Sequence, residues 1–201
     1  MISVSPVEAQ LPCHPVACLA VSLHWAAMTL RAIRFYGDPV LHTAADEVKL
    51  FDPALRTLID DMFATMDAAG GVGLAANQIG VGKRVFVYSC QQMRGHLINP
   101  VWRPLGNAAQ IGPEGCLSVP GVRANIARHK AVLATGVDAL GRPVTLRATG
   151  LLARCIQHES DHLDGIFFLQ RMDSTDRKQA MEHIRSAHWF TARKKEDATC
   201  G

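Results

Sequence analysis

Apolar side chains recur at helical spacing between Pro53 and Gly70, which is the clearest periodic pattern in the chain. They occupy one helical face, at Leu55, Leu58, Ile59, Met62 and Met66. Asp52 is suited to cap this helix, Pro53 to begin it, and Gly70 with Gly71 to end it. The pattern predicts an amphipathic helix whose apolar face packs in the protein core.

Beyond Gly80 the pattern changes to short apolar runs separated by Gly or Pro, which is typical of strands. The predicted strands are Arg84 to Tyr88, Leu97 to Asn99, Ala131 to Val137 and Val144 to Ala148, the last two joined by a hairpin turn over Asp138 to Pro143. Two more helices are expected, one from Leu151 to Leu163 and one from Ser174 to Phe190, the latter with Met181, Ile184 and His188 on one side. Strands that cluster between helices, without regular alternation, indicate an α+β fold with a mostly antiparallel sheet.

Length and charge narrow the classes of protein that fit. A chain of 201 residues suits one globular domain. We expect a poorly structured extension over residues 1–27, a single domain over 28–190 and a flexible tail over 191–201. The net charge of +3 comes without a long stripe of Lys or Arg, so it does not indicate DNA as a partner. Six scattered cysteines without a CxxC pair exclude a disulfide scaffold and favour a cytoplasmic location.

The N-terminal stretch from Ala9 to Leu30 carries no formal charge and is long enough to span a bilayer. Proline, serine and histidine interrupt this stretch. A secretory signal begins with positively charged residues, but no Lys or Arg precedes Arg31. We therefore expect no membrane segment and a loosely structured extension, with Met28 as an alternative start. Cys13, Cys18 and His24 match no standard spacing of zinc ligands.

The strongest chemical signal lies on the second predicted helix. His158 and His162 stand four residues apart, so both imidazoles can reach one metal ion, and Glu159 can carry a proton at a metal-bound water. The third ligand decides the class of enzyme. Phe168 stands where the longer metalloprotease motif needs a third histidine, which excludes that class. Two alternatives remain: a zinc endopeptidase with Glu182 as third ligand, or a site completed by a thiolate.

Two other short segments carry unusual patterns. Glu114 to Ser118 reads EGCLS and offers a thiolate at Cys116, and Gly71 to Gln78 reads GVGLAANQ. Together with QHESDH at Gln157 to His162, these segments resemble peptide deformylase, whose members carry GxGxAAxQ, EGCLS and QHExDH in this order. The resemblance extends from about residue 31 to residue 171. It implies an α+β fold with mostly antiparallel sheets around a central metal-binding helix, and with one helix towards each end of the chain.

The resemblance also implies an activity. Family members remove the N-formyl group from the formylmethionine of newly synthesised proteins and release formate. By similarity, Cys116, His158 and His162 bind one divalent metal ion, and a metal-bound hydroxide attacks the formyl carbon. Fe(II) is the metal that the resemblance implies, while Zn(II), Ni(II) and Co(II) also suit one thiolate and two imidazoles.

Three further residues acquire catalytic roles by similarity. Glu159 would transfer the proton, and the side-chain amide of Gln78 and the backbone N–H of Leu117 would bind the developing oxyanion. Gln78 and Glu159 argue against a structural metal domain or an inactive binder of formylated peptides. A closed structural site needs neither an oxyanion donor nor a proton carrier.

A pocket for the methionine side chain and the peptide backbone is implied as well. Its residues would be Gly71, Val72, Gly73, Gly115, Leu117, Arg123 and Cys155, with Arg123 on the peptide carbonyls. Arg154 stands where many members have an aliphatic residue, and it is expected to extend outwards to solvent. Asp161 is expected to hydrogen-bond a metal-ligating histidine.

The implied partners are nascent formyl-methionyl chains, and a contact with the ribosome near its exit tunnel follows as a hypothesis. The C-terminal segment carries the basic residues Arg177, Lys178, Arg185, Arg193, Lys194 and Lys195. Acidic residues dilute this charge, at Asp173, Asp176, Glu182, Glu196 and Asp197, so a solvated face remains the alternative.

Overall fold

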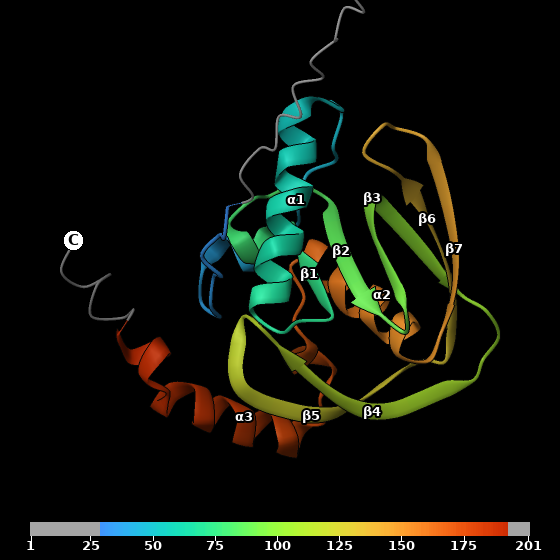
Figure 1. Ribbon diagram of the computed structural model, residues 1–201. Helices are drawn as coiled ribbons and strands as arrows, with labels where there is room; N and C mark the ends of the chain where they lie inside the picture. The colour runs from blue at the N-terminus through green and yellow to red at the C-terminus, as the bar shows by residue number, and fades with distance from the viewer. Residues whose placement is uncertain (1–28, 193–201) are drawn as a thin grey trace, which may run out of the picture.

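The computed structural model describes residues 29–192, which form three α-helices, three short 3₁₀ helices and seven strands (Figure 1). The helices are α1 (Pro53–Ala68), α2 (Gly150–Leu163) and α3 (Ser174–Ser186), and the 3₁₀ helices are η1 (Pro39–His42), η2 (Ala76–Ile79) and η3 (Phe168–Arg171). The predicted extension over residues 1–27 lies outside the described residues, and so do Cys13, Cys18 and His24. Of the tail predicted over 191–201, only residues 191 and 192 are described.

All strand pairs within the two sheets are antiparallel, as predicted. The larger sheet has the order β1-β2-β3-β6-β7, and the smaller one pairs β4 with β5. The strands are β1 (Gly73–Ala75), β2 (Val85–Cys90), β3 (Met93–Pro104), β4 (Ala109–Cys116), β5 (Val119–His129), β6 (Ala131–Val137) and β7 (Pro143–Thr149). The α+β prediction is confirmed.

Helix α1 forms where the apolar periodicity predicts it. Asp52 accepts a hydrogen bond from the backbone N–H of Leu55 at 2.8 Å, which is a side-chain N-cap, and Pro53 occupies the first turn. The predicted apolar stripe is buried, and it packs with the inner side chains of β1 and β2 in one hydrophobic cluster. Gly70 adopts a φ of +66°, so the chain turns out of the helix where a side chain would be strained.

Helix α2 lies at the centre of the fold. It contacts strands of the larger sheet and also β5 of the smaller one, so nearly all its side chains are buried (Figure 1). Its N-terminus is capped from another element, because Gln91 in the β2–β3 turn accepts a hydrogen bond from the N–H of Leu152 at 2.8 Å. This central placement presents both faces of α2 to the protein interior.

Several elements differ from the sequence prediction. Strands β4 and β5 were not predicted, because Gly112, Pro113, Gly115 and Gly121 obscure their alternation. Strand β3 extends far beyond Leu97 to Asn99, through a register shift between Ile98 and Val101. Helix α3 ends at Ser186, because Ala187 turns to an extended backbone. The prediction that this helix continues to Phe190 was wrong, and the exposed His188 lies beyond it.

None of the helices within residues 29–192 is both long enough and apolar enough to cross a membrane.

Candidate active site

The three predicted metal ligands come together although they lie on two different elements. Cys116 is the last residue of β4, whereas His158 and His162 follow one another on the same face of α2. The ligand atoms of the three residues all lie within 4.8 Å of one another, and Nε2 of His162 is 3.1 Å from Sγ of Cys116. One thiolate and two imidazoles at this spacing match a tetrahedral site with one open position.

His158 is oriented by a carboxylate that the sequence analysis did not assign. Its Nδ1 lies 3.0 Å from Oε2 of Glu114, two residues before Cys116. Burial alone would raise the pKa of Glu114, but hydrogen bonds and positive charge from His158 and Arg128 hold that pKa well below its usual range. An ionised carboxylate only accepts, so Nδ1 of His158 donates and its Nε2 is left for a metal.

The Asp161 carboxylate hydrogen-bonds two arginines and neither histidine, so the prediction that it bonds a metal-ligating histidine was wrong. Its carboxylate accepts hydrogen bonds from Arg128 and from Arg171 of η3, the latter at 2.7 Å. Arg128 also forms a two-pronged ion pair with Glu114, through Nε at 2.9 Å and Nη2 at 3.0 Å. The Asp161 carboxylate is therefore linked to His158 by hydrogen bonds through Arg128 and Glu114.

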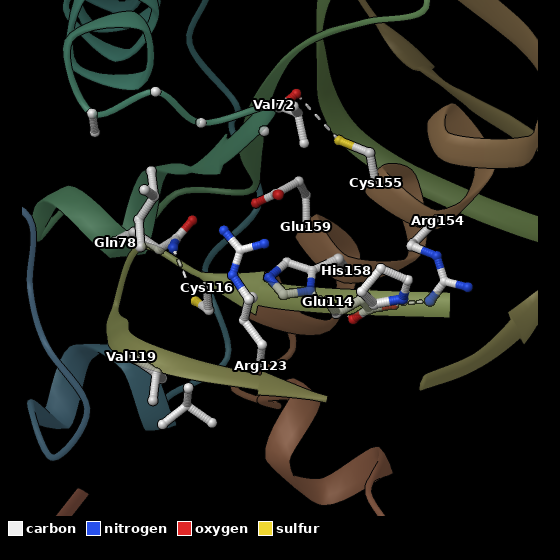
Figure 2. A pocket seen from close by; sticks show the side chains of 18 of the residues that line it. Val72, Gln78, Glu114, Cys116, Val119, Arg123, Arg154, Cys155, His158 and Glu159 are labelled. Atoms are coloured by element: carbon white, nitrogen blue, oxygen red, sulfur yellow. Dashed lines mark hydrogen bonds and ion pairs between the residues drawn. The ribbon is translucent and has the colours of Figure 1, made fainter. Parts of the chain in front are cut away.

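Arg154 also contradicts its prediction, because it points inwards instead of reaching solvent (Figure 2). Its side chain is only 7% exposed, and its guanidinium donates to Oε1 of Glu114 at 2.7 Å and to the carbonyl of Ile126 at 2.8 Å. A buried guanidinium requires such partners, since an unpaired buried charge is strongly unfavourable.

The backbone of α2 near the second histidine has its own buried partner. Asn77 in η2 is fully buried and donates from Nδ2 to the carbonyl of His162. The sequence analysis missed Asn77, although it lies inside the Gly71 to Gln78 motif. It ties η2 to the last turn of α2.

Glu159 lies beside the metal ligands in a buried, crowded position. It is 4% exposed, its Oε2 has no hydrogen-bond partner among the described residues, and burial raises its pKa to about 7. A carboxylate with such a pKa can both accept and return a proton near neutral pH. Gly73 leaves the space for it, as an added Cβ there would overlap the Glu159 carboxylate.

Gln78 presents its amide nitrogen to the same centre. Its Oε1 accepts a hydrogen bond from the N–H of Ala75 at 2.8 Å, which fixes the side chain. Its Nε2 donates to Oγ of Ser118 at 3.1 Å and lies 3.6 Å from Sγ of Cys116. The amide nitrogen of Gln78 thus lies between the hydroxyl of Ser118 and the sulfur of Cys116.

A cavity of about 650 Å³ opens onto these groups (Figure 2). Every predicted site residue except the deeply buried His162 lines it, including Gly71, Val72, Gly73, Gly115, Leu117, Arg123 and Cys155. Arg123 extends from β5 into the cavity, while the thiol of Cys155 lies 3.5 Å from the carbonyl of Val72. The cavity is large enough for a side chain and an extended backbone.

Glu182, the third ligand of the endopeptidase alternative, is not brought to this centre. It is exposed on α3, and the only group of potential metal ligands found among residues 29–192 is the set Cys116, His158 and His162. A two-histidine, one-glutamate site therefore does not form with Glu182.

Comparison with known proteins gives one consistent result. The family model described as polypeptide deformylase matches residues 30–178. Peptide deformylase 1 of Corynebacterium efficiens is 57% identical over 167 residues, covering 81% of this chain and 99% of the relative. A peptide deformylase of Parafrankia sp. is 51% identical over 163 residues, covering 81% of this chain and 89% of the relative.

Solved structures agree with the sequence relatives. A peptide deformylase from Legionella pneumophila superposes with a TM-score of 0.74 at 35% identity, covering 85% of this chain and 98% of the other. A peptide deformylase from Synechococcus elongatus, solved in complex with actinonin, gives a TM-score of 0.74 at 37% identity. That match covers 82% of this chain and 92% of the other.

Proposed function

This chain belongs to the polypeptide deformylase family of metal-dependent hydrolases, and we propose that Cys116, His158 and His162 hold its catalytic metal. The protein removes the N-formyl group from nascent peptides. The observation that carries the proposal is the cluster itself: three ligand atoms within 4.8 Å of one another, beside the buried Glu159. The ion supplies Lewis acidity and lowers the pKa of a bound water when it is present.

Fe(II) is the proposed resident metal. The donor set supports a borderline-soft divalent ion, because one thiolate and two imidazoles suit Fe(II), Zn(II), Co(II) and Ni(II) far better than Mg(II) or Ca(II). The charge-assisted hydrogen bond from His158 to Glu114 keeps the imidazole in the tautomer that a metal requires.

Glu159 is proposed to take the proton that the nucleophilic water loses and to deliver it to the leaving amine. Its unpartnered Oε2 and its pKa of about 7 support this assignment. The amide of Gln78 and the backbone N–H of Leu117 are proposed to donate hydrogen bonds to the formyl oxygen as negative charge develops there.

The rest of the cavity is proposed to bind the peptide. Gly71, Val72, Gly73 and Gly115 would let the substrate backbone lie close to β1 and β4, with Arg123 on its carbonyls. Cys155 and Leu117 would contact the methionine side chain. Support comes from the common cavity that these residues line.

The direct test is formate release from a short formyl-methionyl peptide by anaerobically purified protein, with metal content measured on the same sample. We expect turnover that falls in air and returns with Ni(II) or Co(II). The variant Cys116→Ala should lose both metal and turnover. The variant Cys90→Ala removes a buried cysteine outside the metal cluster and should keep the metal. Metal-loaded protein that releases no formate contradicts the proposal.

A contact with the ribosome is proposed for the C-terminal part of the chain. On α3, Arg177, Lys178 and Arg185 line one groove with Met172 and Met181, which supports attraction to phosphate groups. Removal of residues 193–201, with Lys194 and Lys195, should weaken co-sedimentation with ribosomes and leave turnover of a free peptide unchanged. Equal co-sedimentation at low salt contradicts a contribution of residues 193–201 to this contact.

A further inference from the structure

Arg154 occupies a special position relative to the metal ligands. It precedes His158 by four residues on α2, so the two side chains project from the same helical face. The guanidinium donates hydrogen bonds to three acceptors: Oε1 of Glu114 at 2.7 Å, the carbonyl of Ile126 at 2.8 Å and the carbonyl of Gln110 at 3.3 Å. All three acceptors belong to the β4–β5 hairpin.

The Glu114 carboxylate receives two side chains from one helix. Its Oε1 accepts from Arg154, and its Oε2 accepts from Nδ1 of His158. Two contacts from the same helical face, one turn apart, restrict both rotation of α2 about its axis and sliding along it. Because Cys116 follows Glu114 by two residues on β4, this restriction also acts on the distance between the thiolate and the imidazoles.

We propose that Arg154 is a positioning residue for the metal site. It fixes the hairpin that carries Cys116 against the helix that carries His158 and His162, so the three ligands are in place before the metal binds. This inference rests on the proposed function only in so far as these three side chains hold the metal.

Arg128 also links the hairpin to α2, but at another point of the helix, because it donates from β5 to Asp161. It holds both oxygens of Glu114 as well, so the carboxylate keeps a paired charge without Arg154. The backbone carbonyls of Gln110 and Ile126, in contrast, receive their side-chain bonds from α2 through Arg154. Loss of Arg154 should therefore loosen the hairpin from the helix and leave the charge on Glu114 intact.

The variants Arg154→Met and Arg154→Lys separate positioning from general stability. Methionine keeps an unbranched buried chain without donors, and lysine keeps the charge but not the planar fork that serves three acceptors. The matched control is Arg147→Met on the exposed face of β7, which removes the same charge. For each metal-free protein, Co(II) affinity is measured by chelator competition, together with the thermal midpoint and the turnover per bound Co(II).

We expect Arg154→Met to bind Co(II) about tenfold more weakly or worse, in the range seen when outer partners of metal ligands are removed. The Co(II) affinity of Arg154→Lys should lie between those of Arg154→Met and the unmodified protein. The Co(II) affinity of Arg147→Met should equal that of the unmodified protein. Turnover per bound Co(II) should change little, because the Arg154 guanidinium is bound by Glu114 and by backbone carbonyls of the hairpin and does not act on the reacting atoms.

A lower thermal midpoint in Arg154→Met with unmodified Co(II) affinity overturns the inference, because it assigns Arg154 to stability alone. Should Arg154→Met not fold, Arg154→Lys decides the matter, and unmodified affinity there is the contradicting result. Failure of the proposed function gives a different pattern: the unmodified protein binds Co(II) at this site but releases no formate.

Discussion

Gly73 on β1 and Glu159 on α2 lie so close that a Cβ atom on the glycine would overlap Oε1 of the carboxylate. The same Cβ would lie 2.7 Å from Sγ of Cys155. A shift of the Cβ away from Glu159 is therefore opposed by Cys155. The absence of a side chain at position 73 is thus what allows Glu159 to occupy its place in the cavity.

Gly73→Ala should therefore displace Glu159 while the metal ligands stay in place. Because a positioned general acid–base group contributes about 10²–10⁴-fold, we expect turnover to fall within that range with metal content unchanged. Formate release and metal analysis on the same preparation test this. Gly82→Ala is the control, since an added Cβ there meets no atom within 4 Å. Equal turnover in the two variants contradicts the role of Gly73.

Gln78→Glu should remove the proposed oxyanion donor without changing the size of the side chain. The acceptor for the N–H of Ala75 survives in glutamate, so the fold around η2 is retained. Loss of one such donor lowers turnover by about 10²–10³-fold. The comparison variant is Gln179→Glu on the exposed face of α3, which introduces the same charge. A kcat equal to that of this comparison variant rules out the assignment.

Features that depend on residues close together in the sequence were predicted correctly, whereas contacts between residues far apart in the sequence were missed. Helix α1 and the pairing of His158 with His162 on α2 depend on neighbours within one or two helical turns, so periodicity reveals them. The bond from Arg154 to Glu114 spans 40 positions, and that from Arg128 to Glu114 spans 14. No local pattern marks either pair.

Local composition also misled the prediction of Arg154 and Asp161. A charged residue on a helix is usually at the surface, but α2 is buried from Leu152 to Leu163 and its charges must find partners inside. Asp161 was expected to hydrogen-bond a histidine, but its carboxylate accepts hydrogen bonds from two arginines, one on β5 and one on η3. The short motifs identified the ligands, and the ion pairs that orient them required the tertiary structure.

Asp61 of α1 should stabilise the packing of Thr29 and Arg31 against that helix. Its side chain is 1% exposed and accepts hydrogen bonds from the N–H of Thr29 at 2.7 Å and from Nε of Arg31 at 2.8 Å. Hydrogen bonds to charged groups contribute about 1.5–3 kcal/mol each, so Asp61→Ala should lower the free energy of unfolding by at least about 1.5 kcal/mol. Urea unfolding measures this against Asp60→Ala, an exposed neighbour on the same helix. A difference below about 0.5 kcal/mol between the two contradicts the prediction.

His96 on β3 should make stability depend on pH. Its Nε2 accepts a hydrogen bond from the N–H of Ala139 at 3.0 Å, which requires a neutral ring. Burial lowers the pKa of His96, and the nearby carboxylates of Asp138 and Asp60 offset this only in part. The unfolded chain then binds a proton more readily than the folded one, so stability is lost as the pH falls through the ordinary histidine pKa of about 6.5.

The variant His96→Gln keeps an acceptor for Ala139 and removes the titrating ring. We therefore expect the free energy of unfolding of the unmodified protein, relative to His96→Gln, to be higher at pH 8 than at pH 5. Urea unfolding of both proteins at the two pH values measures this difference, in which the contributions of all other titrating groups cancel. A difference that is the same at both pH values, or larger at pH 5, means that His96 is not held neutral by its burial and by the hydrogen bond from Ala139.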